Sequence, residues 1–400
     1  MIYYIPYLVT SFILALFISL YAVPSVIKIS QLLKLFDNPN ERSATQTAIP
    51  TLGGIAIFMG FIFASTIGLS SDELPQMTYI LLVLTMMFFV GLKDDIVTLS
   101  WWKKLIAQII VTLILIFFAK IRITHLHEIF GIAEIGIVPG SLLTIFVIVV
   151  IINAFNLMDG IDGLAAGLSM LAISIFGLWF LVSGHYQYAI ISVSLFGSIA
   201  GFFYFNVYGT KNKIFMGDTG SLILGTIMSV IVIQFNELNI DSTLPYYIQY
   251  APAVSIAILI YPLADTLKVF TIRVVQFKSP FAADKNHLHH RLLTLGFSHR
   301  KATYTIITFN LAYICTVFML QPYGLFVVVV YMIFMGSILF MLPAYFVQRR
   351  MLIGNEDPFQ QLLMPGSICQ LLENRRKNLT RAKEKVKTKA SNVQTYFRNF

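Results

Sequence analysis

The sequence has few charged residues and almost no cysteine. Asp, Glu, Lys and Arg make up 12% of its 400 residues, whereas 57% are hydrophobic. A soluble domain carries about 25% charged residues, so this chain has too few charges to cover a water-soluble globule, and it is too apolar to be disordered. Its two cysteines, Cys315 and Cys369, cannot build a disulfide framework, and neither has a Cys or His at ligand spacing. An integral membrane protein remains.

Long apolar runs extend along most of the chain. A helix needs about 20 apolar residues to cross a bilayer, and the first run has no cleavage site that would make it a signal peptide. We predict an all-α polytopic membrane protein with about eleven transmembrane helices, near residues 3–29, 50–69, 77–93, 103–119, 138–156, 163–183, 186–206, 219–236, 249–272, 303–321 and 323–347.

The basic residues fall almost entirely on one side of these predicted spans. Of the 28 Lys and Arg residues, 25 lie in the loops after odd-numbered spans or in the tail. The positive-inside rule then predicts an outside N-terminus and a cytoplasmic C-terminus. We interpret the net charge of +9 as a consequence of the orientation in the membrane and not as a sign of nucleic-acid binding. The expected units are a transmembrane domain, 1–348, and a basic cytoplasmic tail, 349–400, which is either solvated or in contact with anionic lipid.

Carboxylates gather at span ends on the predicted cytoplasmic side. Asp94 and Asp95 end the third run in the sequence GLKDD. Adjacent side chains on a helix point about 100° apart, so we expect one carboxylate to contact a cation and the other to orient it or act as a base. Negative charge at a helix C-terminus needs a compensating cation, such as Lys93, Lys103 or a metal. The alternative is a solvated helix end.

Two further polar segments continue this pattern. In segment 153–163, NAFNLMDGIDG, every third residue is Asn or Asp. On an unbroken helix these side chains would spread around the axis, but the two glycines allow the backbone to open so that the side chains converge. The alternative there is a plain polar turn. Segment 215–221, FMGDTGS, opens the eighth run. Its Asp, Thr and Ser serve equally well as helix caps or as a site for Mg²⁺ and phosphate.

The last polar segment, 284–291 (DKNHLHHR), lies in the loop after the ninth run. Three histidines in four positions can indicate zinc, but the H-E-x-x-H pattern of zinc proteases is absent. Because Lys285 and Arg291 flank the histidines, we favour phosphate binding over a metal site or a plain polar loop.

These motifs together are specific. GLKDD, NAFNLMDGIDGLAAG, FMGDTGSL and DKNHLHHRLLTLGFSHRKA occur in this order within residues 30–310. They resemble the polyprenyl-phosphate N-acetylhexosamine-1-phosphate transferases of glycosyltransferase family 4, multispanning bacterial enzymes that start cell-surface polysaccharides. The His-Leu-His-His form is similar to the UDP-GlcNAc:undecaprenyl-phosphate branch.

The resemblance implies a function and a set of site residues. The reaction would transfer a sugar-1-phosphate, with GlcNAc-1-phosphate expected, from a UDP-sugar to undecaprenyl phosphate and release UMP. The cofactor would be Mg²⁺, with Mn²⁺ as a substitute, at Asp218 and Asp159. The enzyme would lie in the bacterial inner membrane with its site on the cytoplasmic face, and a homodimer is left open. The implied catalytic residues are Asp94, Asp95 and Asp218; the implied substrate-binding residues are Asn153, Asn156, Asp159, Gly160, Ile161, Asp162, Phe215, Lys285, His287, His289, His290 and Arg291.

One loop departs from the family pattern. The family carries R-K-x-H before I-P-x-x-G-G, and here Arg42 and the segment 49–54 are kept, but Ser43 and Thr45 take the Lys and His positions. The sugar specificity is therefore left open.

Other classes fit the sequence less well. A secondary transporter would place broken helices and polar groups at mid-membrane depth, whereas the polar residues here lie near one surface. A CDP-alcohol phosphotransferase needs an Ala-Arg after its first Asp-Gly, and residues 162–170 contain no Arg. The sequence favours the sugar-phosphate transferase.

Overall fold

The computed structural model describes residues 2–37, 49–69, 74–275 and 287–353. Within these ranges the chain is mostly helical, as predicted. The elements, in order, are η1 Ile2–Tyr4, α1 Ile5–Leu32, β1 Phe36–Asp37, β2 Ile49–Pro50, α2 Gly53–Gly68, α3 Met77–Ile96, α4 Trp101–Phe117, η2 Ile129–Gly131, α5 Ile137–Met158, α6 Leu164–Val182, α7 Tyr186–Phe203, the π-helix η3 Tyr204–Tyr208, α8 Gly217–Glu237, α9 Ala251–Ile258, α10 Ile260–Val275, α11 Leu288–Thr294, α12 His299–Leu320, η4 Gln321–Tyr323 and α13 Leu325–Ile353.

The number of helices that can cross a membrane is smaller than the number of apolar runs. Within the described ranges, eight helices are long and apolar enough, and a ninth is formed if α9 and α10, which are bent by 76°, count as one span. Helices α2 and α4 have 16 and 17 residues. A polytopic α-helical membrane protein is confirmed, whereas eleven spans and the orientation stay predictions. The tail after residue 353 lies outside the described residues.

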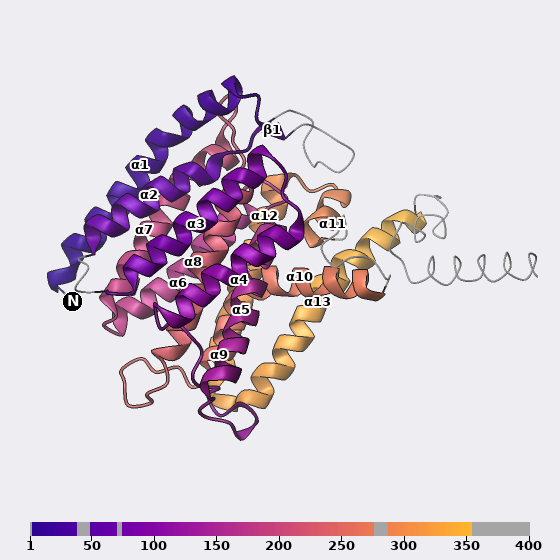
Figure 1. Cartoon of the computed structure of the whole chain (residues 1–400). Helices are drawn as coiled ribbons and strands as arrows, with labels where there is room; N and C mark the ends of the chain where they lie inside the picture. Colours follow the sequence, from indigo (N-terminus) through magenta and orange to yellow (C-terminus); the bar gives the residue numbers. More distant parts are fainter. Residues whose placement is uncertain (1, 38–48, 70–73, 276–286, 354–400) are drawn as a thin grey trace, which may run out of the picture.

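Helix α8 is the centre of the bundle. It packs against α2, α3, α5 and α6, and 94% of the residues in its apolar 18-residue stretch are buried. Helices α1, α2 and α7 pack on one another at one side of the bundle, while α9, α12 and α13 lie at the other (Figure 1). The ends of several helices therefore meet around the start of α8.

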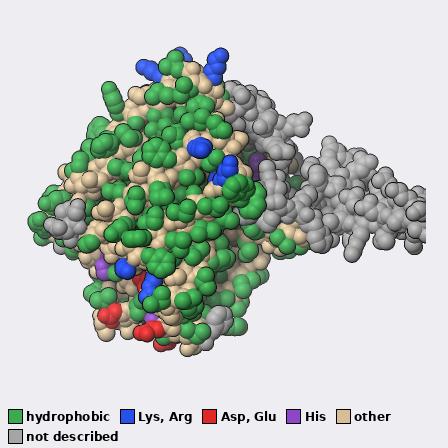
Figure 2. All heavy atoms as spheres, viewed as in Figure 1, with side chains coloured by type: hydrophobic (Ala, Val, Ile, Leu, Met, Phe, Trp, Pro, Cys, Tyr) green, Lys and Arg blue, Asp and Glu red, His purple; other side chains and the backbone are tan. Residues whose placement is uncertain are grey.

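The surface is apolar through its middle. Figure 2 shows hydrophobic side chains over most of this face, with Lys and Arg at its upper end and in smaller groups lower down, and the visible Asp and Glu in its lower part. Large side chains such as Phe17 and Phe326 are exposed by 65% and 81%. Contiguous exposed apolar surface of this kind is typical of contact with lipid.

Candidate active site

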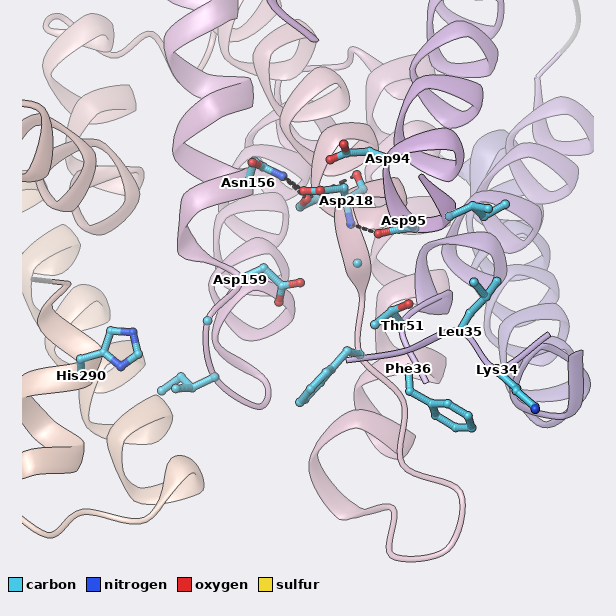
Figure 3. Close-up of a pocket in the computed structure, with 16 residues that line it drawn as sticks. Lys34, Leu35, Phe36, Thr51, Asp94, Asp95, Asn156, Asp159, Asp218 and His290 are labelled. Atoms are coloured by element: carbon cyan, nitrogen blue, oxygen red, sulfur yellow. Dashed lines mark hydrogen bonds between the residues drawn. The ribbon is translucent and has the colours of Figure 1, made fainter. Parts of the chain in front are cut away.

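A cavity of about 570 Å³ lies where α3 and α5 end and α8 begins. Four carboxylates line it, and Figure 3 shows them pointing into one space from three helix ends. The structure thus brings together residues from all four predicted motifs. The lining residues are Lys34, Leu35, Phe36, Thr51, Asp94, Asp95, Ile96, Asn156, Asp159, Gly160, Ile161, Phe215, Gly217, Asp218, Ser221 and His290.

Asp95 joins the end of α3 to the start of α8. Its Oδ1 accepts a hydrogen bond from the backbone N of Asp218 at 2.7 Å, and its Oδ2 accepts from the N and Oγ1 of Thr219 at 3.0 and 2.5 Å. The first turn of a helix has free N–H groups that attract an anion, and here the anion is a carboxylate of the same chain. These two amides are therefore not available to a phosphate.

Asp94 and Asp218 share one cation. Oδ1 of Asp94 accepts from the backbone N of Leu99 at 2.5 Å, and its Oδ2 lies 2.7 Å from Nζ of Lys104. The same Nζ lies 3.5 Å from Oδ2 of Asp218. Two carboxylates this close repel each other unless a cation lies beside them. The compensating cation is thus Lys104, and not Lys93 or Lys103.

Asn156 orients Asp218. Its Nδ2 donates a hydrogen bond to Oδ1 of Asp218 and a second, of 3.0 Å, to Oγ of Ser221. Because Asn156 lies in the last turns of α5, this contact ties α5 to the first turn of α8. The other oxygen of Asp218 is left facing Lys104.

Gly91 allows α3 to lie against α8. A Cβ on Gly91 would lie 2.5 Å from Cα of Thr219 and 2.8 Å from the backbone O of Asp218. Real Cβ atoms do not approach backbone so closely, because the two atoms would overlap within their van der Waals radii. The glycine in GLKDD is therefore what lets the following two aspartates reach the start of α8.

The turn between α5 and α6 opens as predicted. Helix α5 ends at Met158, and Gly163 has φ of +74°, a conformation that favours glycine. Asp159 points into the cavity from this turn (Figure 3). Burial, followed by the negative charges of Asp95 and Asp162, raises the pKa of Asp159 to about 7. Asp159 is therefore partly protonated at neutral pH.

Two residues of the same segment do not reach the cavity wall. Nδ2 of Asn153 donates to Oε1 of Gln108 at 2.8 Å. Oδ2 of Asp162 lies 2.6 Å from Nζ of Lys213 and 3.2 Å from Nδ1 of His299. Burial raises the pKa of Asp162, but hydrogen bonds from His299 and Lys213 outweigh it and leave the pKa below its usual value. The expectation that all polar residues of segment 153–163 converge is wrong for Asn153 and Asp162.

Of the three predicted histidines, His290 lines the cavity and the other two are buried beside it. Nδ1 of His287 lies 2.7 Å from Oδ2 of Asp265, whose Oδ1 accepts from the backbone N of Leu288 at 3.0 Å. This pairing fixes the start of α11 on α10. His287 therefore holds the segment in place, outside the cavity wall.

His289 supports the turn after α5. A Cβ on Gly160 would lie 2.4 Å from Nε2 of His289, so the imidazole packs directly on that glycine. Burial lowers the pKa of His289 to about 3, so the ring is neutral and cannot bind phosphate as a cation. Arg291 donates to the backbone O of Phe340 at 3.4 Å. Lys285 lies outside the described residues.

The sequence did not indicate one wall of the cavity. Lys34, Leu35 and Phe36 follow α1, and β1 pairs with β2 in antiparallel register, Phe36 opposite Pro50. The backbone N of Phe215 donates to O of Pro50 at 2.7 Å, which joins this strand pair to the loop before α8. Short strands between apolar helices give no clear periodicity. Ser43 and Thr45, between the two strands, lie outside the described residues.

The oxygen donors suit a hard cation. Mg²⁺ prefers carboxylate oxygens, and those of Asp94 and Asp218 meet beside Lys104. Among the described residues, however, no three His, Cys, Asp or Glu side chains are grouped at metal-binding spacing. The metal site at Asp218 and Asp159 stays a prediction.

Fold and site together define a multispanning membrane protein with an acidic cavity at the end of its helix bundle. Residues 77–236 match the sequence model of the family described as Glycosyl transferase family 4. The undecaprenyl-phosphate alpha-N-acetylglucosaminyl 1-phosphate transferase of Escherichia coli K12 is 31% identical over 327 residues, which cover 80% of this chain and 86% of that protein. The Salmonella typhi transferase of that name is 30% identical over 325 residues, which cover 80% and 86%.

A third relative has a similar level of identity. The probable undecaprenyl-phosphate N-acetylglucosaminyl 1-phosphate transferase of Bacillus subtilis strain 168 is 31% identical over 342 residues, which cover 83% of this chain and 91% of that protein. The chain belongs to glycosyl transferase family 4.

Proposed function

We propose that this protein transfers GlcNAc-1-phosphate from UDP-GlcNAc to undecaprenyl phosphate, releases UMP, and so starts synthesis of a cell-surface polysaccharide. The observation that carries the proposal is the pair of carboxylates, Asp94 and Asp218, held together beside Lys104 in a cavity formed by the family's motifs. The relatives are named for transfer of N-acetylglucosaminyl 1-phosphate to undecaprenyl phosphate, which supports the same reaction.

The reaction is a displacement at phosphorus. An oxygen of the undecaprenyl phosphate forms a bond to the β-phosphorus of the UDP-sugar. The bond between that phosphorus and the oxygen that bridges the two phosphates breaks, and UMP leaves with the bridging oxygen. Such a transfer depends mainly on positioning and on neutralising charge.

The side chains divide this work. Asp95 fixes α3 to the first turn of α8, which sets the position of Asp218. Asn156 holds one oxygen of Asp218, so that the second points at Lys104. We assign Asp94 to the acceptor phosphate, because Oδ2 of Asp94 is paired with the ammonium of Lys104, whereas both oxygens of Asp95 are held by the first turn of α8. Asp159, Phe215 and His290 would contact the UDP-sugar.

Asp218, with Asp94 or Asp159, would hold Mg²⁺, or Mn²⁺ in its place. The metal would neutralise charge on the diphosphate, which is the chemistry that acidic cavities of phosphoryl-transfer enzymes need. Without a cation, the four carboxylates of the cavity would repel both anionic substrates.

The site would face the cytoplasm from the bacterial inner membrane, where UDP-sugars are made. Eleven spans, with α2 and α4 as short ones and α9–α10 as a broken one, would put the N-terminus outside and the C-terminus inside. The concentration of basic residues on the cavity side supports this orientation.

The test is transfer of radiolabelled GlcNAc-1-phosphate to undecaprenyl phosphate by the purified full chain in detergent. Asp218→Asn should lose at least about a hundredfold in rate, and the loss should persist across a Mg²⁺ titration. Asp241→Asn, a change in an exposed loop far from the cavity, is the matched control. A panel of UDP-sugars would identify the donor. Uptake of a solute by proteoliposomes without any lipid-linked product would overturn the proposal in favour of a transporter.

A further inference from the structure

The turn that ends α1 has a geometry that favours glycine and carries Lys34. The backbone N of Leu35 donates to O of Ser30 at 2.9 Å, and that of Lys34 to O of Gln31 at 3.2 Å. This pair of hydrogen bonds forms the Schellman motif that ends many helices. Lys34 has φ of 55°, the left-handed conformation that the motif requires. A residue with a Cβ is strained there, so lysine is kept where glycine would fit better.

The strained turn forms one wall of the cavity. Lys34, Leu35 and Phe36 all line it. Figure 3 shows Lys34 and His290 at opposite sides of the cavity, with Asp159 between them. The pairing of β1 with β2, and of β2 with Phe215, fixes this wall to the loop before α8. The backbone at Lys34 is thus fixed beside the site, and the exposed side chain extends from it.

Lys34 is the lysine among the described residues that line the cavity. The cavity is lined by four carboxylates, and across the described residues the ammonium of Lys34 has no hydrogen bond or ion pair. Lys104 and Lys213, in contrast, are each paired with a carboxylate. A cation without a partner, at the wall of an acidic cavity, is placed to attract the oxygens of an incoming anion.

We propose that Lys34 binds a phosphate group of a substrate in this cavity and that the strained turn is kept for this charge. The inference rests on the proposed function, in which the UDP-sugar and the polyprenyl phosphate both bring phosphate. A cation at a helix C-terminus also interacts favourably with the helix dipole. That effect alone would change stability and leave substrate affinity as it is, so the two explanations can be separated.

The test compares two lysines with the same backbone conformation. Lys120 has φ of 58°, is exposed, and lies in the α4–α5 connection, outside the cavity lining. Lys34→Gly and Lys120→Gly therefore remove the same charge and the same strain at two places. Lys34→Asn removes the charge with a residue that tolerates the left-handed conformation, and Lys34→Arg keeps the charge.

We expect Lys34→Gly and Lys34→Asn to raise KM for one phosphate substrate roughly tenfold, the size expected for a charge-assisted hydrogen bond. Thermal stability should be unchanged or higher in Lys34→Gly. Lys34→Arg should stay near wild type, and Lys120→Gly should keep both KM values. Separate KM measurements for UDP-GlcNAc and for undecaprenyl phosphate, each with the other saturating, identify which phosphate Lys34 contacts.

Unchanged KM values for both substrates in Lys34→Gly would overturn the inference, and a lower Tm in that variant would assign Lys34 to the helix dipole. Calorimetric titration of UDP-GlcNAc and of undecaprenyl phosphate into each variant keeps this test independent of turnover. A wild-type protein that binds a substrate more tightly than Lys34→Gly does, yet transfers nothing, would sink the proposed function and support the role of Lys34.

Discussion

Asp95 and Thr219 form a two-point contact between α3 and α8, in which one carboxylate oxygen accepts from both the backbone N and the hydroxyl of the threonine. The contact replaces the side-chain cap that α8 lacks within its own sequence. It explains why the second aspartate of GLKDD is turned away from Lys104 while the first is paired with it.

Asp95→Asn should destabilise the protein by about 1–2 kcal/mol, because the amide places an NH₂ group opposite the N–H groups of α8 and removes the negative charge there. Thermal unfolding in detergent measures the loss. Asp241→Asn, on an exposed loop, should change Tm much less. If the two variants unfold at one temperature, Asp95 does not secure α8.

Gly91→Ala should lower stability by roughly 1–3 kcal/mol, because the added methyl must push α3 away from α8 in a packed interior. The transfer rate should also fall in protein that is still folded, because the shift moves Asp94 and Asp95 away from the start of α8. Gly336→Ala is the control, because a Cβ there has no atom within 4 Å. Equal activity of the two variants would contradict the close approach.

The pairing of Asp162 with Lys213 and His299 predicts a loss of stability in acid. The pKa of Asp162 is below its usual value of 3.8 in the folded protein. Its stabilisation is therefore fully present above that value and is lost as pH falls through the folded pKa. Tm measured from pH 5 down to pH 2 should therefore fall less steeply in Asp162→Asn than in wild type. At pH 7 the free energy of unfolding of Asp162→Asn should be about 1–3 kcal/mol lower than that of wild type.

Lys213 and its neighbour Lys211 provide a check on the partner of Asp162. Lys213→Gln should reproduce part of the loss, while Lys211→Gln, which changes an exposed side chain two residues away, should not. An Asp162→Asn variant whose Tm follows the wild-type pH curve would show that another group titrates.

Lys104→Met should make the protein depend more on divalent metal. Without its ammonium, Asp94 and Asp218 repel each other, and in EDTA we expect the free energy of unfolding to fall by roughly 2 kcal/mol, the size of a hydrogen bond to a charged group. Because a ligand that binds the folded state stabilises it, added Mg²⁺ should raise Tm more in this variant than in wild type. Lys103→Met, with an exposed lysine next in sequence, is the control. If Mg²⁺ raised the Tm of wild type, Lys104→Met and Lys103→Met equally, the ammonium of Lys104 and the metal would not occupy the same position between Asp94 and Asp218.

The sequence predicted the parts of the site that depend on local pattern. Asp94 and Asp95 at a helix end, Asp218 at a helix start, and the opened turn around Asp159 are all where apolar runs meet glycine and acidic residues. Those signals lie within a few residues of one another, so the sequence carries them.

What the sequence could not predict depends on contacts between distant helices. His287 and His289 occur in a basic, polar segment, and nothing local indicates that Asp265 and Gly160 bury them. Lys104 is paired with Asp94 and Asp218 only because α3 packs against both α4 and α8. The apolar runs likewise did not indicate that α2 and α4 are short or that α9 and α10 are bent by 76°.

The enclosure of α8 has a consequence for how the enzyme responds to its surroundings. In helix α13 only 22% of the residues in the apolar 18-residue stretch are buried. Few protein contacts hold this helix, so its tilt and depth can adjust to the acyl chains around it. Helix α8 is surrounded by other helices, and contacts with these helices fix its depth and its rotation. Asp218 should therefore hold its place in thin and thick bilayers alike, even where the outer helices lean.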